Sequence, residues 1–361
     1  MWAQLEVVAT GLQAPQKVIT TPSGNLLVSE TSMSLRSGRI SFVTPAGARR
    51  SFMEGLPSGV EVAGGGSGPT AMALRDRTLY VAIGGGDAER RSQTPGVAIH
   101  NPEGVSSAIF ASVLRLQLDR DIDSISGTFQ MTPAHEQVLR DGGEVRMEDG
   151  SGASATVIVL TRLPISEPDP NTVYRFSNPW GFALSADGST LYLNDASMNA
   201  LVRINTATGR WERIVRFPPS QNSTPVGPPV IDAVPTSVRI YGEQLLVSFL
   251  TGFPFIPGSA RVLAVNPTTR AVEPFIFGLT SVTDVLWRPT SGDRPQFFVL
   301  EFSQNQSQQP PPPGRLLRYD TPMPEVVSAD LRAPVSLALD ASSNTLYVLE
   351  LTGRLLRLRL N

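Results

Sequence analysis

The sequence of 361 residues contains no cysteine, which excludes disulfides, thiol catalysis and thiolate metal sites together. Histidine occurs only twice, and Lys17 is the only lysine among 30 basic side chains. No apolar run approaches the length of a membrane span. The formal net charge of −2 gives no electrostatic reason to expect nucleic acid or an anionic membrane as a partner.

What the sequence does contain is an internal repeat that links its two ends. Pro15 and Pro334 each open an apolar run, and a second run follows in each copy, at residues 26–30 and 346–350. A third run completes each copy, at residues 39–43 and 354–360. Short apolar runs separated by turn residues are typical of antiparallel strands.

The repeat recurs along the whole chain. Its openings are spaced by 54, 110, 56, 47 and 52 residues, at Pro15, Pro69, Pro179, Pro235, Val282 and Pro334. Four-stranded units repeating about every fifty residues indicate propeller blades. The sequence therefore predicts an all-β fold, a six-bladed β-propeller with four-stranded blades, in a single domain over residues 1–361. The spacing of 110 residues places insertions in blade two, at about 84–107 and 134–178, with a short helix over 134–140 and a hairpin around 149–152.

The last repeat stops after three strands, whereas an additional apolar segment, residues 5–10, precedes the first opening. This segment resembles residues 325–329, which precede the last opening. We therefore expect the N-terminal strand to complete the last blade, next to residues 354–360. Such a pairing would close the ring and remove an exposed sheet edge.

Strand direction predicts which loops meet. The first strand of a blade leaves one face along the central channel and the second strand returns to that face. The links that enter the blades and the loops after the second strands should therefore share one face, which we call the loop-rich face. The long loops fall there, including the glycine loop at 84–86 and the proline loop at 303–314, and long loops on a rigid scaffold commonly carry binding.

Acidic residues end four of the six second strands and should gather at the channel mouth on this face. Lys17 and Asp284 are the third residues of two first strands, and Asn178 directly precedes the opening of another. Together with the four acids, these residues form what we call the channel-mouth set: Lys17, Glu30, Asn178, Asp195, Asp284, Glu301 and Glu350. Oxygen ligands from several blades suit calcium, and Glu30, Asn178 and Asp284 are its candidate ligands. Bound calcium could activate water for hydrolysis of a lactone or ester. The alternative is structural: the acids would cap backbone amides and pair with arginines, and Lys17 would pair with Asp284.

A second candidate binding element is the apolar loop at residues 250–258. Phe253 and Phe255 alternate with prolines there, up to Pro257. A stiff apolar loop is costly to expose unless it packs or binds. We expect it to fold over the loop-rich face, against the loops of blade two or blade five.

Other catalytic patterns are weaker. His100 and His135 both lie in the blade-two insertions, and no Gly-x-Ser-x-Gly elbow accompanies them. The glycines at 84–86 lack the Gly-Lys-Ser/Thr ending of a phosphate loop. The four prolines at 310–313 favour a stiff extended spacer, with a docking site for a partner as the alternative.

The chain resembles the ScyD/ScyE family of exported propeller proteins. The most specific match is Thr251-Gly-Phe-Pro-Phe255, and Ser177-Asn-Pro-Trp-Gly-Phe182, Leu300-Glu-Phe-Ser303 and Thr283-Asp284 also fit the family pattern. More distantly, the arrangement is similar to gluconolactonases and strictosidine-synthase-like propellers. The ScyD/ScyE resemblance implies a six-bladed propeller and export, and it supplies no catalytic residues. Residues 1–4 are not a signal peptide, so export implies that a leader was removed; a cytoplasmic location is the alternative.

Two functions remain open. The first, which we favour, is a non-catalytic binding protein that engages a small molecule or protein partner through the loop-rich face. The second is a calcium-assisted hydrolase with its site at the channel mouth. A hydrolase should bring carboxylates from at least three blades to one metal, whereas a scaffold should pair those acids with arginines or backbone amides. The oligomeric state is not readable from the sequence.

Overall fold

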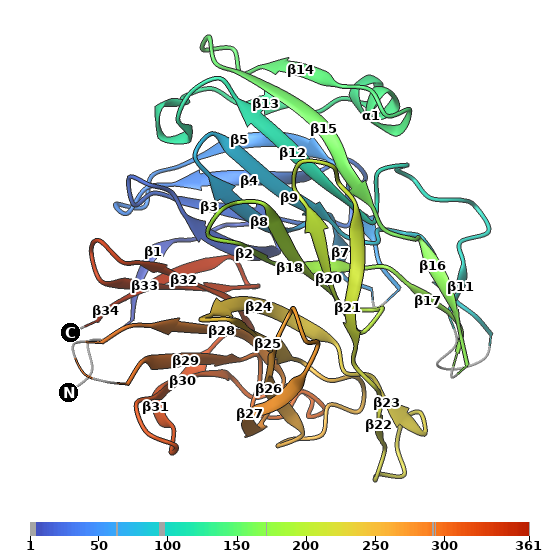
Figure 1. The fold of residues 1–361 in the computed structure, drawn as a ribbon, viewed down its shortest axis with the longest axis vertical. Helices are drawn as coiled ribbons and strands as arrows, with labels where there is room; N and C mark the ends of the chain where they lie inside the picture. Colours follow the sequence, from blue (N-terminus) through green and yellow to red (C-terminus); the bar gives the residue numbers. More distant parts are fainter. Residues whose placement is uncertain are drawn as a thin grey trace.

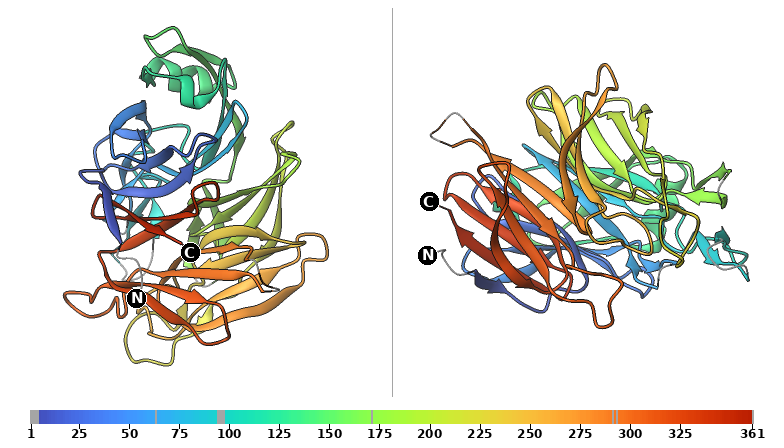
Figure 2. Two further views of the ribbon diagram at one scale, coloured as in Figure 1. Left: turned by 90° about the vertical axis from the view of Figure 1, so that its left-hand side faces the viewer. Right: turned by 90° about the horizontal axis from the view of Figure 1, so that it is seen from below.

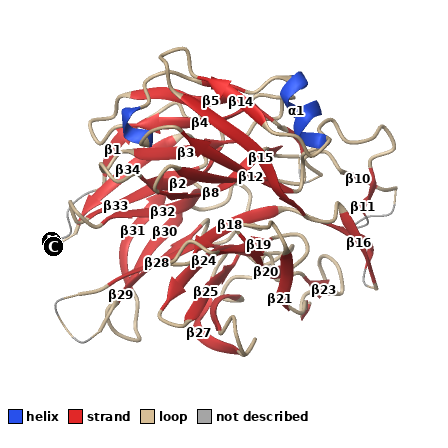
Figure 3. Ribbon diagram, turned by 45° about the horizontal axis from the view of Figure 1, so that its top comes forward, coloured by secondary structure: helices blue, strands red, loops and turns tan. Residues whose placement is uncertain are grey.

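The computed structural model describes residues 5–62, 64–93, 98–170, 172–290, 292 and 294–360. Almost every element is a strand, as Figure 3 shows, and the only helices of the described chain are α1 (Pro133–Arg140) and the 3₁₀ helix η1 (Ile122–Ser124). Neither helix is long and apolar enough to cross a membrane.

Six sheets are arranged around a central axis, which Figure 2 views from the side opposite the loops (left panel). The expected six-bladed propeller is thus confirmed. From the centre outward, blade one contains β2 (Pro15–Thr20), β3 (Leu26–Glu30), β4 (Gly38–Val43), β5 (Arg49–Leu56) and β13 (Phe129–Gln130). Blade two contains β8 (Pro69–Arg75), β9 (Thr78–Ile83), β12 (Ser112–Leu118), β15 (Ser154–Arg162) and β14 (Val145–Glu148). Blade three contains β18 (Pro179–Leu184), β19 (Thr190–Asp195), β20 (Ala200–Asn205) and β21 (Trp211–Arg216).

The remaining three blades have four strands each. Blade four contains β24 (Pro235–Tyr241), β25 (Gln244–Phe249), β26 (Ala260–Val265) and β27 (Val272–Leu279). Blade five contains β28 (Val282–Arg288), β29 (Gln296–Glu301), β30 (Gly314–Tyr319) and β31 (Glu325–Leu331). Blade six contains β32 (Pro334–Asp340), β33 (Thr345–Glu350), β34 (Arg354–Arg359) and β1 (Glu6–Ala9).

The ring closes as expected. Strand β1 pairs antiparallel with β34, with Glu6 opposite Arg357 and Val7 opposite Leu356. Ala9 is buried in a cluster that joins this blade to blade one. The first and last parts of the chain therefore share one sheet, at the left of Figure 1.

Each innermost strand begins with the same local geometry. The opening residue lies opposite the last residue of the second strand, as Pro15 lies opposite Glu30, and a bulge follows directly. In blades one and six the residue before the opening is left-handed, with φ of 39° at Ala14 and 50° at Ala333. Its carbonyl accepts the N–H of the residue after the second strand, at 2.9 Å for Ala333 and Leu351. The blade entries and the second-strand ends therefore share one face.

Blades one and two depart from the expected four strands. Strand β13 adds to β5 in parallel, with Phe129 opposite Met53. Strand β14 adds to β15 through the hairpin expected around residues 149–152. Phe129 and Phe52 pack edge to face at 5.5 Å within the largest apolar cluster. The blade-two insertion thus fuses two neighbouring blades at their outer rim.

Four short hairpins extend the loops. They are β6–β7 (Gly59–Val60, Gly66–Ser67), β10–β11 (Glu89–Arg91, Ala98–His100), β16–β17 (Ser166–Asp169, Thr172–Phe176) and β22–β23 (Ser220–Gln221, Val230–Ile231). The last three project at the right of Figure 1, away from the chain ends. The predicted helix over 134–140 is present as α1, with the Thr132 side chain accepting from His135 N at 3.2 Å.

Candidate functional site

The acids of the channel-mouth set are buried and internally bonded. Glu30 is 0% exposed and accepts from Arg39 Nη2 at 2.7 Å, from Ser41 Oγ and from the backbone N–H of Gln13. Gln13 lies in the link that enters the blade. The carboxylate therefore ties the blade entry to the second and third strands.

Blades five and six repeat this arrangement. Glu301 accepts from Thr280 N at 2.8 Å and Arg315 Nε at 2.6 Å. Glu350 accepts from Arg332 N at 2.7 Å and pairs with Arg354. Burial raises the pKa of Glu301, against the lowering effects of the Thr280 amide and Arg315. In these three blades the structural interpretation of the acids matches the observed contacts.

In blade three no arginine of the described chain pairs with the acid. Asp195 accepts from Asn178 N at 2.8 Å, Met198 N at 3.0 Å and the Ser177 hydroxyl. Burial raises the pKa of Asp195, although these hydrogen bonds act in the opposite direction. The Asn178 side chain points elsewhere: its Oδ1 accepts from Gly85 N of the blade-two loop at 3.2 Å.

The expected pair of Lys17 and Asp284 is replaced by a different one. The partner of Asp284 is Arg239, whose Nη2 lies 2.8 Å from Oδ2. Lys17 Nζ donates to the carbonyl of Thr236 at 3.2 Å, across the ring from blade one to blade four. No oxygen of Asp284 lies within ion-pair distance of Lys17, both being described residues. A buried aspartate is better matched by the forked guanidinium, which forms two bonds at once.

The predicted calcium ligands do not fit a cation. The Glu30 and Asp284 oxygens face guanidinium and amide hydrogens, and the Asn178 oxygen accepts a backbone N–H. Across the part of the chain that the structure describes, no three acidic or histidine side chains converge on one point. These three residues are therefore not brought together as a metal site.

The apolar loop of blade four lies on the loop-rich face, as expected. The Ser307 hydroxyl, in the blade-five loop, donates to the carbonyl of Pro254. Phe253 packs edge to face on Phe255 at 6.0 Å and also meets Gly227, where an added Cβ would lie 2.9 Å from the ring. Phe253 nevertheless stays 49% exposed. The expected contact with blade five is confirmed, and half of one aromatic side chain remains available on the surface.

A carboxyl pair that the sequence analysis missed lies on the same face. Glu61, in the β6–β7 hairpin, and Glu89, in β10, line a small pocket with Gly86, Ser177 and Asn178. Burial raises the pKa of both glutamates to about 7, and for Glu89 the charge of Glu61 contributes further. The pairing depends on two separate loops meeting, and no repeat position marked it in the sequence.

The two histidines have different surroundings. His100 Nε2 lies 2.9 Å from Ser166 Oγ, and its ring packs edge to face on Tyr174 at 4.7 Å. His135 lies in α1, at the outer rim. His100 stands opposite Glu89 in the β10–β11 ladder, so it is the histidine nearer the carboxyl pair.

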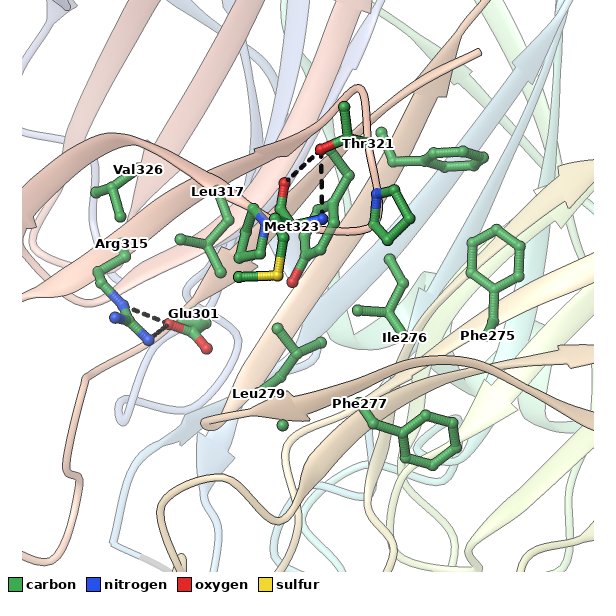
Figure 4. Close-up of a pocket in the computed structure, with 15 residues that line it drawn as sticks. Phe275, Ile276, Phe277, Leu279, Glu301, Arg315, Leu317, Thr321, Met323 and Val326 are labelled. Carbon is green, nitrogen blue, oxygen red and sulfur yellow. Dashed lines mark hydrogen bonds and ion pairs between the residues drawn. The ribbon is translucent and has the colours of Figure 1, made fainter. Parts of the chain in front are cut away.

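A cavity of about 640 Å³ lies away from the channel, between β27 of blade four and the sheet of blade five. Figure 4 shows its apolar lining, which includes Phe275, Leu279 and Met323. The charged pair at its edge, Glu301 and Arg315, is bonded internally. The cavity therefore offers apolar surface rather than reactive groups.

No protein-family model and no curated protein matches the chain. Solved structures match over nearly its whole length. A sugar dehydrogenase from Streptomyces coelicolor, bound to PQQ, shares 15% identity with a TM-score of 0.50 over 99% of this chain and 98% of that one. A gluconolactonase from Xanthomonas campestris shares 10% identity with a TM-score of 0.50 over 99% and 90%.

An auxiliary nutrient binding protein from Bacteroides thetaiotaomicron shares 7% identity with a TM-score of 0.52, over 96% of this chain and 69% of that one. At such identities the likeness shows the fold alone. Since enzymes and a binding protein share the architecture, function must be argued from the residues.

Proposed function

We propose that this protein is a non-catalytic binding protein that engages a protein partner through the loop-rich face. The observation that supports this proposal is where exposed apolar side chains occur. Of the thirteen large apolar residues exposed in the described chain, seven lie in the loops and short hairpins of this face: Met33, Leu35, Val60, Ile99, Val105, Val226 and Phe253. They come from several blades, and exposed apolar side chains distributed over several blades suit a protein partner better than a small molecule.

The chemistry of the channel mouth supports the same proposal. Four strand-end carboxylates accept hydrogen bonds from groups within the protein, as expected for a scaffold. Catalysis needs groups that can exchange protons or bind a reacting atom, and these acids already have their partners.

The test is a comparison of matched variants. Leu35→Ser with Phe253→Ser should abolish retention of a specific partner when the immobilised protein is exposed to extract of its source cells. Met323→Ser is the control, because Met323 is 77% exposed on a turn of the opposite face. Equal retention by both variants would contradict the proposal.

A second candidate function is hydrolysis, and the Glu61–Glu89 pair favours it. Two neighbouring carboxyl groups that each have a pKa of about 7 can share one proton at neutral pH. The ionised group would take a proton from water as the water oxygen attacks a lactone carbonyl. The protonated group would give its proton to the departing ring oxygen.

Calcium is the cofactor that we propose for this hydrolase. A cation between Glu61 and Glu89 would relieve the repulsion between their carboxylates. Under the hydrolase proposal calcium should raise the Tm by several degrees and a chelator should lower it. Glu61→Gln with Glu89→Gln should remove both the calcium response and lactone hydrolysis. If calcium changes neither the Tm nor the activity, the proposal that calcium is the cofactor of the hydrolase is wrong.

We also propose, from the resemblance described above, that the protein is exported and related to the ScyD/ScyE proteins. Thr251-Gly-Phe-Pro-Phe255 supports this proposal, because it forms the exposed aromatic part of the loop-rich face. Fractionation of source cells tests the location: recovery in the cytoplasm alone would contradict export.

A further inference from the structure

The central channel opens, on the face opposite the loops, into a cavity of about 390 Å³. We call it the channel cavity. All six innermost strands line it, and the walls are mostly apolar, with Leu74, Leu184, Trp287 and Leu339 among them. This volume and this kind of lining are typical of sites for small molecules.

A small chamber, which includes four polar residues in its lining, continues the channel cavity toward the centre of the ring. Its volume is about 20 Å³, enough for about one water. The chamber shares Met72, Phe182 and Arg239 with the channel cavity and adds Lys17 and Ser336. An apolar space thus ends at polar groups, deep in the molecule.

The chamber carries an excess positive charge. Asp284 accepts hydrogen bonds from Arg239 Nε and Nη2, from the backbone N–H groups of Val285 and Leu337, and from the Ser336 hydroxyl. Asp284 thus balances the charge of Arg239, and the charge of Lys17 remains. No other charged residue lines the chamber or the cavity within the described chain.

Lys17 has hydrogen-bonding capacity to spare. Lys17 is only 7% exposed, and among the described residues its Nζ has a single hydrogen-bond partner, the Thr236 carbonyl. An ammonium group has three hydrogens to donate. Two of them are therefore available to the acceptor atoms of a ligand.

Hydrogen bonds link neighbouring blades at the loop-side end of the channel, and Lys17 extends across the ring there. The hydroxyls of Thr70, Thr236 and Thr283 donate to the opening carbonyl of the next blade, at 2.6, 2.9 and 3.0 Å. These threonines are buried, as is Lys17. The chamber that Lys17 lines adjoins the channel cavity, so a ligand would reach Lys17 from the face opposite the loops.

We propose that the channel cavity binds a small organic monoanion, with its carboxylate at Lys17 and its apolar body against the channel wall. This site lies on the other face from the proposed partner surface and is independent of it. The anion would supply the acceptors that Lys17 lacks. Burial lowers the pKa of Lys17 to about 8 despite the nearby Asp284, so the ammonium is poorly stabilised until an anion arrives.

Calorimetric titration with three ligands of one chain length tests the proposal. Decanoate should bind with one-to-one stoichiometry, whereas neutral decanamide and cationic decylammonium should bind at least tenfold more weakly. Equal affinities for decanoate and decanamide, or no decanoate binding at millimolar concentration, would overturn it.

Two variants locate the site. Lys17→Met keeps the apolar stem and should weaken decanoate binding at least tenfold without changing decanamide binding. Thr20→Glu leaves Lys17 in place and adds a negative charge to the cavity wall, so it should weaken decanoate and strengthen decylammonium. Thr208→Glu, at an exposed turn on the same face, is the matched control. An equal effect of Thr20→Glu and Thr208→Glu would contradict a site in the channel.

Discussion

At the scale of single residues, one interaction recurs around the ring. In blades one, five and six the acid that ends the second strand lies opposite an arginine at or next to the start of the third: Arg39, Arg315 and Arg354. Blade four keeps an arginine, Arg261, but replaces the acid with Phe249, and the guanidinium lies over that ring at 5.2 Å. The position thus keeps a contact between strands two and three while the chemistry changes, which indicates a structural role.

This role predicts a large stability effect of Glu30→Ala. The substitution leaves Arg39 and the Gln13 amide without their buried partner. We expect a loss of about 3 kcal/mol in the free energy of unfolding, measured with urea. Glu6→Ala, which breaks an exposed pair with Arg357, should cost less than about 1 kcal/mol. Equal costs would mean that Glu30 is not part of the blade framework.

The Glu61–Glu89 pair predicts a pH dependence of stability. A folded-state pKa of about 7, above the usual 4.5, means that the folded state binds more protons than the unfolded state between these values. Stability from these groups is present below pH 4.5 and declines as the pH rises to 7. Glu61→Gln should therefore stabilise the protein above pH 7, by about 1 kcal/mol after allowance for partial exposure, and should have little effect near pH 4. A pH-independent difference in urea unfolding would contradict the pKa shift.

At the scale of elements, the sequence was informative wherever the repeat applied. All six predicted openings begin an innermost strand, from Pro15 to Pro334, because one turn and one bulge recur in each blade. Strand β13 was not predictable in this way. It has two residues, pairs in parallel with another blade and is held by Phe129, so only the assembled structure defines it.

The candidate site was predictable in position but less so in chemistry. The acids do end their strands on one face, yet Gly38-Arg39, Gly314-Arg315 and Gly353-Arg354 stand in the same repeat and already indicated their partners. Arg239 could not be assigned to Asp284 in advance, because it crosses between blades. The channel cavity could not be foreseen either, since its volume depends on how six strands pack.

The closing strand predicts a contrast between two neighbouring positions. Ala9 is 8% exposed and Val7 is 55% exposed in the same strand, β1. Ala9→Asp would bury a charge against blade one and should lower the Tm by roughly 5–10 °C. Val7→Asp should change the Tm by less than about 2 °C. Similar Tm values for both variants, measured by circular dichroism, would contradict the observed orientation of β1.

At the scale of the whole molecule, the two faces of the ring have different properties. The loop-rich face exposes apolar side chains from several blades, whereas the opposite face contains the mouth of the channel cavity. Between them the Lys17 side chain crosses the channel from blade one to blade four. Binding on one face therefore need not affect binding on the other.

Closure of the ring by β1 predicts what happens when that strand is removed. Deletion of residues 1–10 should expose the edge of β34, whose backbone groups would then be free to pair with another chain. We expect a lower Tm and concentration-dependent self-association, measured by size-exclusion chromatography with light scattering.

A synthetic peptide of residues 1–12 should reverse both effects by adding a strand in trans, because main-chain hydrogen bonds supply most of such an interaction. The same peptide with Ala9→Asp should fail, since Ala9 packs into the joining cluster. A truncated chain that stays monomeric with an unchanged Tm would show that the ring is held closed without β1.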